Sequence, residues 1–361
     1  MRRSRLMRRE PSPGRRLLAA LLYPVKLVVQ VALLGVTLAS FAPVFADRLP
    51  VFAVFESFLP QLAVVALALT LPALLFRPRW LAILGPVAVA WNIAAVWSYL
   101  PWQGGTTQAS AEGASAADEA PVLKVVSANV WYRNDGYAAA LNYFTASNAD
   151  VIAVIEATPQ WKIALAPLFA KYPYRTDCMD RQPPCEMMLL SKVPFQRSFA
   201  GRIEGRSPTI VWGEIVFSGR PIVVAATHLS WPLRAAAGNA GSTIAGTLQS
   251  PPLSGSDPLV QSQQGRVLAG YLKGLGPDLV LMGDFNSVPW SRTQVALRAA
   301  TGLKDAGPMV PTWPSWQPAW SRLPIDHIMT RGALQRLGFK SGHYIGSDHL
   351  PVEAEIILQP Q

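Results

Sequence analysis

Three long apolar stretches fill most of the first hundred positions of this 361-residue chain. They run roughly over Val25–Ala46, Phe55–Phe76 and Trp80–Leu100. A helix needs about 20 consecutive apolar residues to cross the hydrocarbon core of a bilayer, where it satisfies its own backbone hydrogen bonds. A cleaved signal peptide has one shorter apolar region, so three such stretches do not fit it. The sequence therefore predicts a basic N-terminus over residues 1–24 and three transmembrane helices within residues 25–102.

The distribution of Lys and Arg around these stretches predicts their orientation, because basic loops stay on the cytoplasmic side of a membrane. Seven Arg precede the first stretch, Arg48 lies between the first and second, Arg77 and Arg79 lie between the second and third, and residues 103–120 contain none. The pattern alternates inside, outside, inside, outside. We therefore expect a multi-pass protein of the bacterial cytoplasmic (inner) membrane whose C-terminal part lies outside the cytoplasm, in the periplasm or on the outer membrane face.

The composition changes sharply after the third apolar stretch. Residues 103–120 are rich in Gly, Ala, Ser and Thr, which predicts a flexible linker to a domain over residues 121–361. The net charge of +10 invites a nucleic-acid interpretation. However, residues 1–105 contain 11 Lys and Arg against 3 Asp and Glu, whereas residues 106–361 contain 21 against 19. The basic excess belongs to the membrane part, so bulk charge gives no reason to expect a DNA-binding face on the C-terminal domain.

The two cysteines, Cys178 and Cys185, lie seven positions apart in the segment DCMDRQPPC. This spacing fits no zinc motif. They are either two free thiols or, in an oxidising compartment, a disulfide that closes a small loop.

In the C-terminal domain, apolar β-branched runs alternate with helix-like segments, which predicts a layered α/β fold. Polar residues able to bind metal or phosphate follow these runs at the expected strand ends. Because sites in layered α/β folds form where strand ends and their loops converge, we expect these residues to share one cleft. They are Asn129, Glu156, His228, Asp284, Asn286, Asp326, Asp348 and His349.

The chemical types in this set suit phosphate-ester hydrolysis. Carboxylate and amide oxygens favour a hard cation such as Mg²⁺ (or Mn²⁺) over zinc. A histidine can donate to a phosphate oxygen or supply a proton. Each residue by itself is equally compatible with a turn, a helix cap or an exposed strand end, so only the whole set predicts a site.

The segments SANVW, VIE, THL, GDFN, IDHI and SDHLP occur in this order between residues 122 and 358. In order and spacing they resemble the endonuclease/exonuclease/phosphatase (DNase I-like) superfamily. The resemblance implies a four-layer α/β sandwich, with two face-to-face sheets between outer helices, and a metal-dependent hydrolase of phosphoester bonds. Two places depart from the usual pattern: Ile155 replaces a Gln, and VWYRN follows the first strand where many relatives have a Gly-containing turn.

The resemblance also implies a cation-binding set. Asn129 and Glu156 match the positions that bind the divalent cation, and Asp348 assists them. No residue outside these motifs is assigned to the metal.

The remaining matched positions correspond to catalytic groups. Asp284 matches the residue that orients or deprotonates the attacking water, and Asn286 contacts the phosphate beside it. His228 matches a histidine near the leaving group and the phosphate. Asp326 and His349 match an Asp–His pair at the scissile phosphate, with the division between base and acid left open.

The fold does not decide the substrate, but the expected location does favour one class. A tethered domain outside the cytoplasm meets lipid head groups at high local concentration, and the architecture resembles membrane-anchored bacterial proteins linked to teicoplanin resistance. Trp231 and the Trp-rich segment at 311–320 are candidates for contact with lipid or an interface. We therefore expect a lipid phosphate or pyrophosphate as substrate; the alternatives are an extracytoplasmic nuclease and a receptor that binds phosphate-bearing ligands without hydrolysis.

Overall fold

The computed structural model divides the chain into two compact units. The first comprises residues up to Val44 together with Leu59–Ala95, and the second comprises Phe45–Phe58 together with Val96–Gln361. The expected linker at 103–120 and much of the expected N-terminus lie outside the described residues. The structure describes residues 13–100, 121–181, 184–203, 206–231, 259–305 and 309–359.

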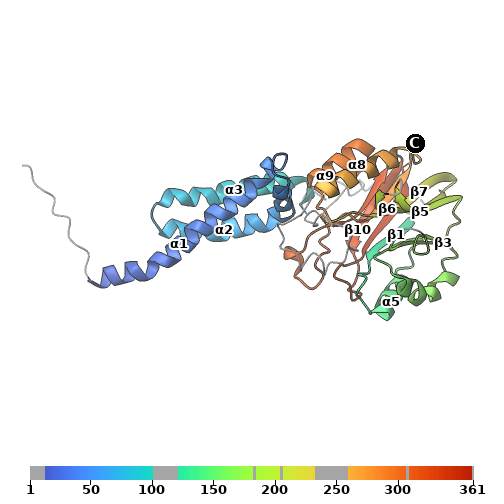
Figure 1. Ribbon diagram of the computed structural model, residues 1–361, viewed down its shortest axis with the longest axis horizontal. Coiled ribbons are helices and arrows are strands. Elements are labelled where there is room, and N and C mark those ends of the chain that lie inside the picture. Colours follow the sequence, from blue (N-terminus) through green and yellow to red (C-terminus); the bar gives the residue numbers. More distant parts are fainter. Residues whose placement is uncertain are drawn as a thin grey trace, which may run out of the picture. The chain divides into compact units, whose positions relative to one another are not determined.

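The first unit is built from three apolar helices (Figure 1). These are α1 (Pro13–Phe41), α2 (Leu59–Leu75) and α3 (Leu84–Val96). Short 3₁₀ segments adjoin them along the chain: η1 (Ala42–Phe45) and η3 (Arg79–Ile83), and, in the second unit, η2 (Pro50–Phe58) and η4 (Trp97–Tyr99). Three segments are long and apolar enough to cross a membrane, Ala20–Phe45, Pro50–Leu75 and Arg79–Tyr99, which confirms the expected number of membrane-type helices.

Small and polar residues hold these helices together. Gly85 lies so close to α2 that a Cβ at this position would overlap the side chain of Thr70. The side-chain amide of Asn92 on α3 donates to the hydroxyl of Ser40 on α1 at 2.9 Å. Close approach at small residues and interhelical hydrogen bonds are typical of helices that pack in lipid, where apolar burial gives no driving force.

The second unit contains two β-sheets (Figure 1). The first has the strand order β10 (Leu334–Ser341), β11 (Val352–Leu358), β1 (Leu123–Asn129), β2 (Val151–Ile155), β4 (Met187–Ser191) and β3 (Tyr174–Asp177). The second has the order β5 (Arg197–Ile203), β6 (Arg206–Phe217), β7 (Arg220–His228), β8 (Leu279–Asp284) and β9 (Asp326–Arg331). Helices α5 (Tyr137–Ser147), α6 (Pro159–Ala164) and η6 (Ala166–Ala170) follow strands of the first sheet, and α8 (Leu259–Lys273), α9 (Arg292–Thr301) and η7 (Ala319–Ser321) belong to the second half of the chain.

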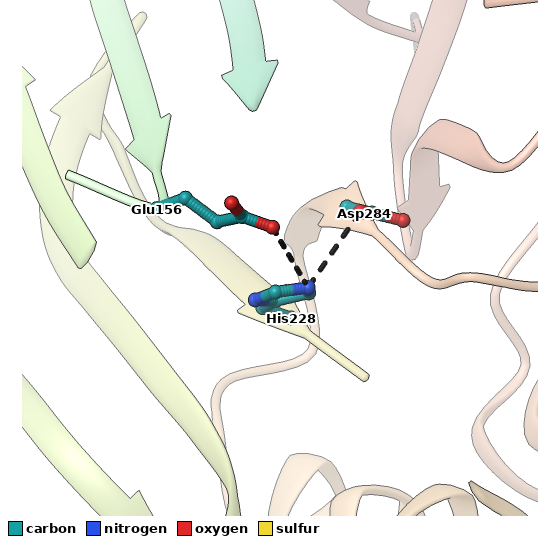
Figure 2. Close-up of side chains that lie close together, drawn as sticks. All are labelled: Glu156, His228 and Asp284. Atoms are coloured by element: carbon teal, nitrogen blue, oxygen red, sulfur yellow. Dashed lines mark ion pairs between the residues drawn. The ribbon is translucent and has the colours of Figure 1, made fainter. Parts of the chain in front are cut away.

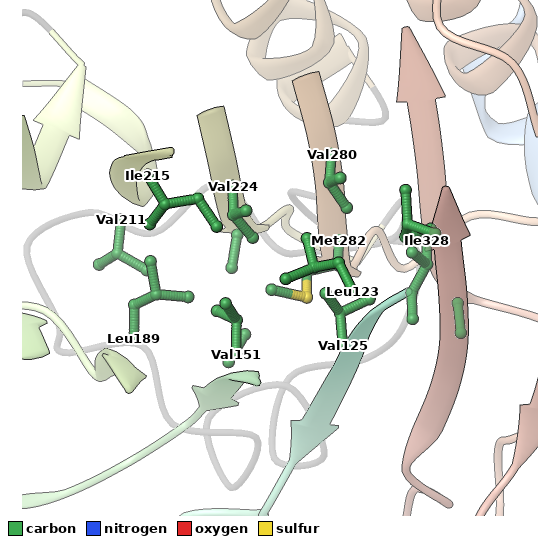
Figure 3. Packing of buried hydrophobic residues seen from close by; sticks show 14 of the residues in the cluster. Leu123, Val125, Val151, Leu189, Val211, Ile215, Val224, Val280, Met282 and Ile328 are labelled. Atoms are coloured by element: carbon green, nitrogen blue, oxygen red, sulfur yellow. The ribbon is translucent and has the colours of Figure 1, made fainter. Parts of the chain in front are cut away.

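Three buried apolar layers join these elements into four structural layers. Between the sheets, Val125 and Val151 face Val224 and Met282 (Figure 3). On the outer face of the first sheet, the next residues along the strands, such as Val126 and Ile152, pack against α5 and α6. Residues of β7 and β8 likewise pack against α8 and α9. Successive strand residues point to opposite faces, so nearly continuous apolar strands bury both, and the expected four-layer α/β sandwich is confirmed.

Strand direction determines where the polar strand ends meet. β1 and β2 run parallel, with Asn129 opposite Ile155. In the other sheet β7 and β8 run parallel, with His228 opposite Asp284, and β9 pairs antiparallel so that Asp284 is opposite Asp326. The ends of β1, β2, β7 and β8 and the start of β9 therefore lie at one edge of the sandwich, where Asn129 reaches Asp284.

Local sequence signals account for several of these elements. The β6–β7 hairpin turns through Ser218 and Gly219, both with positive φ (49° and 77°), as a two-residue turn of type I′ requires. The helical segment over residues 159–170 is divided at Leu165 into α6 and η6, with Pro167 in the first turn of η6. Cys178 and Cys185 form a disulfide between β3 and β4, and both are buried in the layer between the sheets.

Candidate active site

The site begins with Asn129, which links the two sheets. Its side-chain amide donates to Glu156 Oε1 at 3.0 Å and to Asp284 Oδ2 at 3.1 Å. Its Oδ1 accepts from the backbone N–H of Trp131 at 2.9 Å. One buried amide thus holds a carboxylate from each sheet at the same point.

Glu156, His228 and Asp284 form a cluster with the spacing of a metal site (Figure 2). One ligand atom from each lies within 4.8 Å of the others. His228 Nε2 is 3.9 Å from Glu156 Oε1 and 3.6 Å from Asp284 Oδ2. Glu156 has a left-handed backbone (φ 57°), and its other oxygen accepts from Tyr132 N at 3.2 Å. A strained conformation persists only when its surroundings fix it, and such positions cluster at functional sites.

Asp326 and His349 form a buried pair next to this cluster. His349 Nδ1 donates to Asp326 Oδ2 at 2.8 Å, and the same oxygen accepts from the hydroxyl of Thr312 at 2.6 Å. His349 Nε2 lies 3.6 Å from Asp284 Oδ2. The carboxylate of Asp326 therefore fixes the ring with Nε2 directed at Asp284.

Asp348 lies beside the Asp326–His349 pair, in the loop before β11. One of its oxygens accepts from the indole N–H of Trp313 at 3.2 Å. The neighbouring hydroxyl of Ser347 donates to the backbone carbonyl of Asn129 at 2.7 Å and accepts from His349 N at 3.1 Å. These bonds join the loop before β11 to the end of β1.

Asn286 adopts a left-handed backbone (φ 47°) directly after β8. Its backbone N–H donates to Asp284 Oδ1 at 2.8 Å. Its side-chain amide donates to the carbonyl of Leu229 at 2.9 Å and lies 3.3 Å from His228 Nε2. The turn thus presents the Asn286 amide beside the carboxylate of Asp284.

Residues 126–349 match the sequence pattern of the Endonuclease/Exonuclease/phosphatase family. The chain belongs to that family. Its members are metal-dependent hydrolases of phosphoester bonds, and so is this protein. No protein with a curated description matches the chain.

Several solved structures are similar to this chain in fold. A humanized TDP2 from D. rerio is 17% identical, with 65% of this chain and 98% of that one covered, at a TM-score of 0.50. A conserved protein of unknown function from Enterococcus faecalis V583 is 15% identical, with 66% and 100% covered, at 0.51. An endonuclease/exonuclease/phosphatase from Bacteroides vulgatus is 13% identical with the same coverage, also at 0.51. At these identities the likeness shows the fold alone.

The structure brings all eight residues expected from the sequence to this one edge of the family fold. It adds partners that the sequence did not indicate: Thr312 and Trp313 orient Asp326 and Asp348 from a loop with no recognisable motif. A buried threonine and an indole carry no local signal of such a role, since only the folded loop gives them their partners.

The residues present fit the divalent cation that family enzymes use. Carboxylates of Glu156, Asp284 and Asp348 with one imidazole form a donor set dominated by hard oxygen. Burial raises the pKa of Asp348, and the charge of Glu156 raises it further. Carboxylates that crowd together in this way are stabilised in their charged form by a nearby cation.

The pKa values of Asp284 and His349 predict how the phosphoesterase activity of this protein depends on pH. Burial raises the pKa of Asp284 to about 6, although His349 and His228 oppose the shift. Burial disfavours the charged His349 ring, but the carboxylates of Asp326 and Asp284 outweigh it and raise the pKa of His349 to about 10. Because a base must be deprotonated and an acid protonated, we expect kcat/KM to rise as pH passes about 6 and to fall towards about 10.

A bound cation favours the carboxylate and moves the lower limb to lower pH, so the profile is measured at two Mg²⁺ concentrations. The upper limb should disappear when His349 is replaced by Gln. An upper limb that survives this replacement would assign it to another group.

Proposed function

We propose that this protein is a membrane-anchored, extracytoplasmic, Mg²⁺-dependent phosphoesterase that hydrolyses a phosphate ester or pyrophosphate of a membrane lipid. One observation supports the lipid class above others. Two largely exposed tryptophans, Trp316 and Trp320, project from a loop whose base is hydrogen-bonded to Asp326 and Asp348.

In this proposal Glu156 and Asp348, with Asn129 beside them, would hold the cation, which would supply positive charge to offset that of the phosphoryl group. The oxygen that Asn129 could contribute also accepts from the backbone of Trp131, so the two roles share one atom.

The catalytic residues divide the proton transfers. Asp284 orients and deprotonates the attacking water. Asn286 and His228 donate to phosphate oxygens, while His349, held by Asp326, stabilises developing charge or protonates the leaving group.

The tryptophan loop is rigid at its base. Ser315 donates from its backbone to the carbonyl of Asp348 at 2.8 Å and from its hydroxyl to the carbonyl of Ser347 at 2.6 Å. The side chain of Arg322 donates to the carbonyls of Gln317 and Ser315. Trp316 and Trp320 are 65% and 71% exposed beyond this braced base. Indole rings favour the boundary between lipid and water, so such a loop suits an enzyme whose substrate lies in a bilayer.

The extracytoplasmic location rests on two supports. Arg residues are concentrated before the first apolar helix and between the second and third. The disulfide between Cys178 and Cys185 fits an oxidising compartment, because cytosolic thiols are kept reduced. Free thiols in the native protein would remove the second support, and labelling with and without reductant measures this.

A Mg²⁺-dependent activity panel tests the substrate class. It includes vesicles containing a lipid pyrophosphate or sphingomyelin, soluble inositol phosphates, and single- and double-stranded DNA. We expect turnover of a vesicle lipid to exceed that of the soluble substrates. Turnover of DNA with no lipid cleaved would replace the lipid proposal with the nuclease alternative.

The double variant Trp316→Ala/Trp320→Ala tests the loop. We expect its rate on vesicles to fall about tenfold or more, which corresponds to about 1.4 kcal/mol of lost interfacial binding, while its rate on a soluble chromogenic phosphodiester stays unchanged. Ile163→Ala on α6, where the side chain is 74% exposed, is the matched control and should change neither rate. Equal losses on both substrates would assign the tryptophans to the active site rather than to lipid contact.

A further inference from the structure

A second buried charged network lies behind the active site, on the opposite face of β9. Its members are Asp305, His327 and Arg336. His327 Nδ1 is 3.1 Å from Asp305 Oδ2, and Arg336 Nη1 is 3.1 Å from Asp305 Oδ1. All three side chains are at least 93% buried. Burial alone would raise the pKa of Asp305, but the hydrogen bond from His327 and the nearby positive charge, including that of Arg336, lower this pKa to about 2.

A buried network of this kind is a weak source of stability, because removing charges from water costs nearly as much as their attraction returns. Stability therefore does not account for the network, whereas its contacts with the active-site turn suggest a role for it.

His327 contacts the residues on both sides of Asn286. Its Nε2 is 2.9 Å from the backbone carbonyl of Ser287. Its ring meets the ring of Phe285 edge to face, with centroids 5.4 Å apart. Both hydrogen-bond partners of His327 are acceptors, so both ring nitrogens donate in this arrangement. The imidazole therefore fixes the two flanks of a residue whose own backbone is in the left-handed region.

Other contacts to this turn come from different directions. Phe285 N donates to the carbonyl of Ile325, and the amide of Gln294 donates to the hydroxyl of Ser287 at 3.1 Å. The side-chain amide of Gln261 donates to the carbonyls of Phe285 at 3.3 Å and Asn286 at 2.8 Å. His327 contacts Phe285 and Ser287 from β9, and it is in turn held by Asp305. Because β9 carries Asp326 and His327 in succession, one strand orients His349 through its first residue and the Asn286 turn through its second.

We propose that His327, held by Asp305 and Arg336, is a positioning residue for the catalytic turn Asp284–Ser287. It acts by keeping Asn286 in the left-handed conformation that directs its backbone N–H to Asp284 and its side-chain amide towards the phosphate. The proposal rests on the roles given above to Asp284 and Asn286.

The test compares His327→Phe, which keeps a ring against Phe285 but has no donor, with His327→Gln, whose amide retains a donor for the Ser287 carbonyl. With Mg²⁺ and a chromogenic phosphodiester, we expect kcat of His327→Phe to fall about 10–100-fold with little change in KM, since small misplacements of reacting groups cost this much. We expect His327→Gln to recover part of that loss. Hydrogen exchange of the peptide containing residues 284–288 should be faster in His327→Phe than in the wild type.

Asp278→Asn is the matched control. Asp278 is a buried carboxylate at the opposite end of β8, where it accepts from Arg220 Nη2 at 2.8 Å and from Ala333 N at 2.7 Å. This variant should lose thermal stability while keeping kcat and the exchange rate of residues 284–288. Equal losses of kcat in His327→Phe and Asp278→Asn would overturn the positioning role. Unchanged hydrogen exchange of residues 284–288 in His327→Phe would also overturn it. If Asp284→Asn retained activity, the proposed catalytic roles would fail instead, whatever His327→Phe shows.

Discussion

Replacing Asp284 with Asn is expected to lower kcat by about 10²–10⁴-fold, the usual contribution of a positioned acid or base. Asp284 lies at the centre of the site: its Oδ2 is within 3.6 Å of both His228 and His349, and it accepts from Asn129 at 3.1 Å. Burial raises its pKa to about 6, so it is ionised at neutral pH yet basic enough to accept a proton from water. An amide has no such basicity.

The variant should remain folded, because the Asn oxygen can still accept from the backbone N–H of Asn286. The melting temperature of the catalytic unit and single-turnover rates on the best substrate of the panel measure the two expectations. Asp278→Asn, on the same strand, serves as the control that keeps its activity. Equal turnover by wild type and Asp284→Asn would reject the role given to Asp284.

Removal of divalent cations should abolish activity, and Mg²⁺ should restore it and also stabilise the protein. A ligand at about 100 times its Kd stabilises the folded state by about 2.7 kcal/mol, which raises the melting temperature of a domain of this size by about 5–10 °C. We expect the effect to require the carboxylates of Glu156 and Asp348, which would hold the cation and whose charges act on each other.

Glu156→Gln separates this site from other cation binding. The change removes the charge but keeps an oxygen that can accept from Tyr132 N. We expect it to lose most of the stabilisation by Mg²⁺ and to need much higher Mg²⁺ for activity. Glu355→Gln, which alters an exposed carboxylate paired with Lys124, should respond to Mg²⁺ like the wild type. Identical Mg²⁺ responses of wild type and Glu156→Gln would place the cation elsewhere.

Much of the catalytic unit could be predicted from the sequence because its signals are local. The apolar runs that became β1, β2, β7 and β8 bury both faces, as Val125 and Val126 show by entering different layers. The hairpin turn places Gly219 at a positive φ of 77°, a conformation that glycine adopts readily. Strands β3, β5 and β10 carry exposed polar residues and are held mainly by their neighbours, so an apolar pattern does not predict them.

The sequence by itself determined the three membrane-type helices and the positions of the polar residues at strand ends, because apolar runs and the residues that follow them are properties of short segments. The resemblance of its motifs to a known family implied the four-layer fold. Only the tertiary structure decided how those residues are oriented. Asp326 and His349 are 23 positions apart, Asn129 and Asp284 155 apart, and Ser347 and Asn129 218 apart. Hydrogen bonds over such separations depend on how the sheets pack, so the support that Thr312, Trp313 and His327 give to the site emerges only in the folded chain.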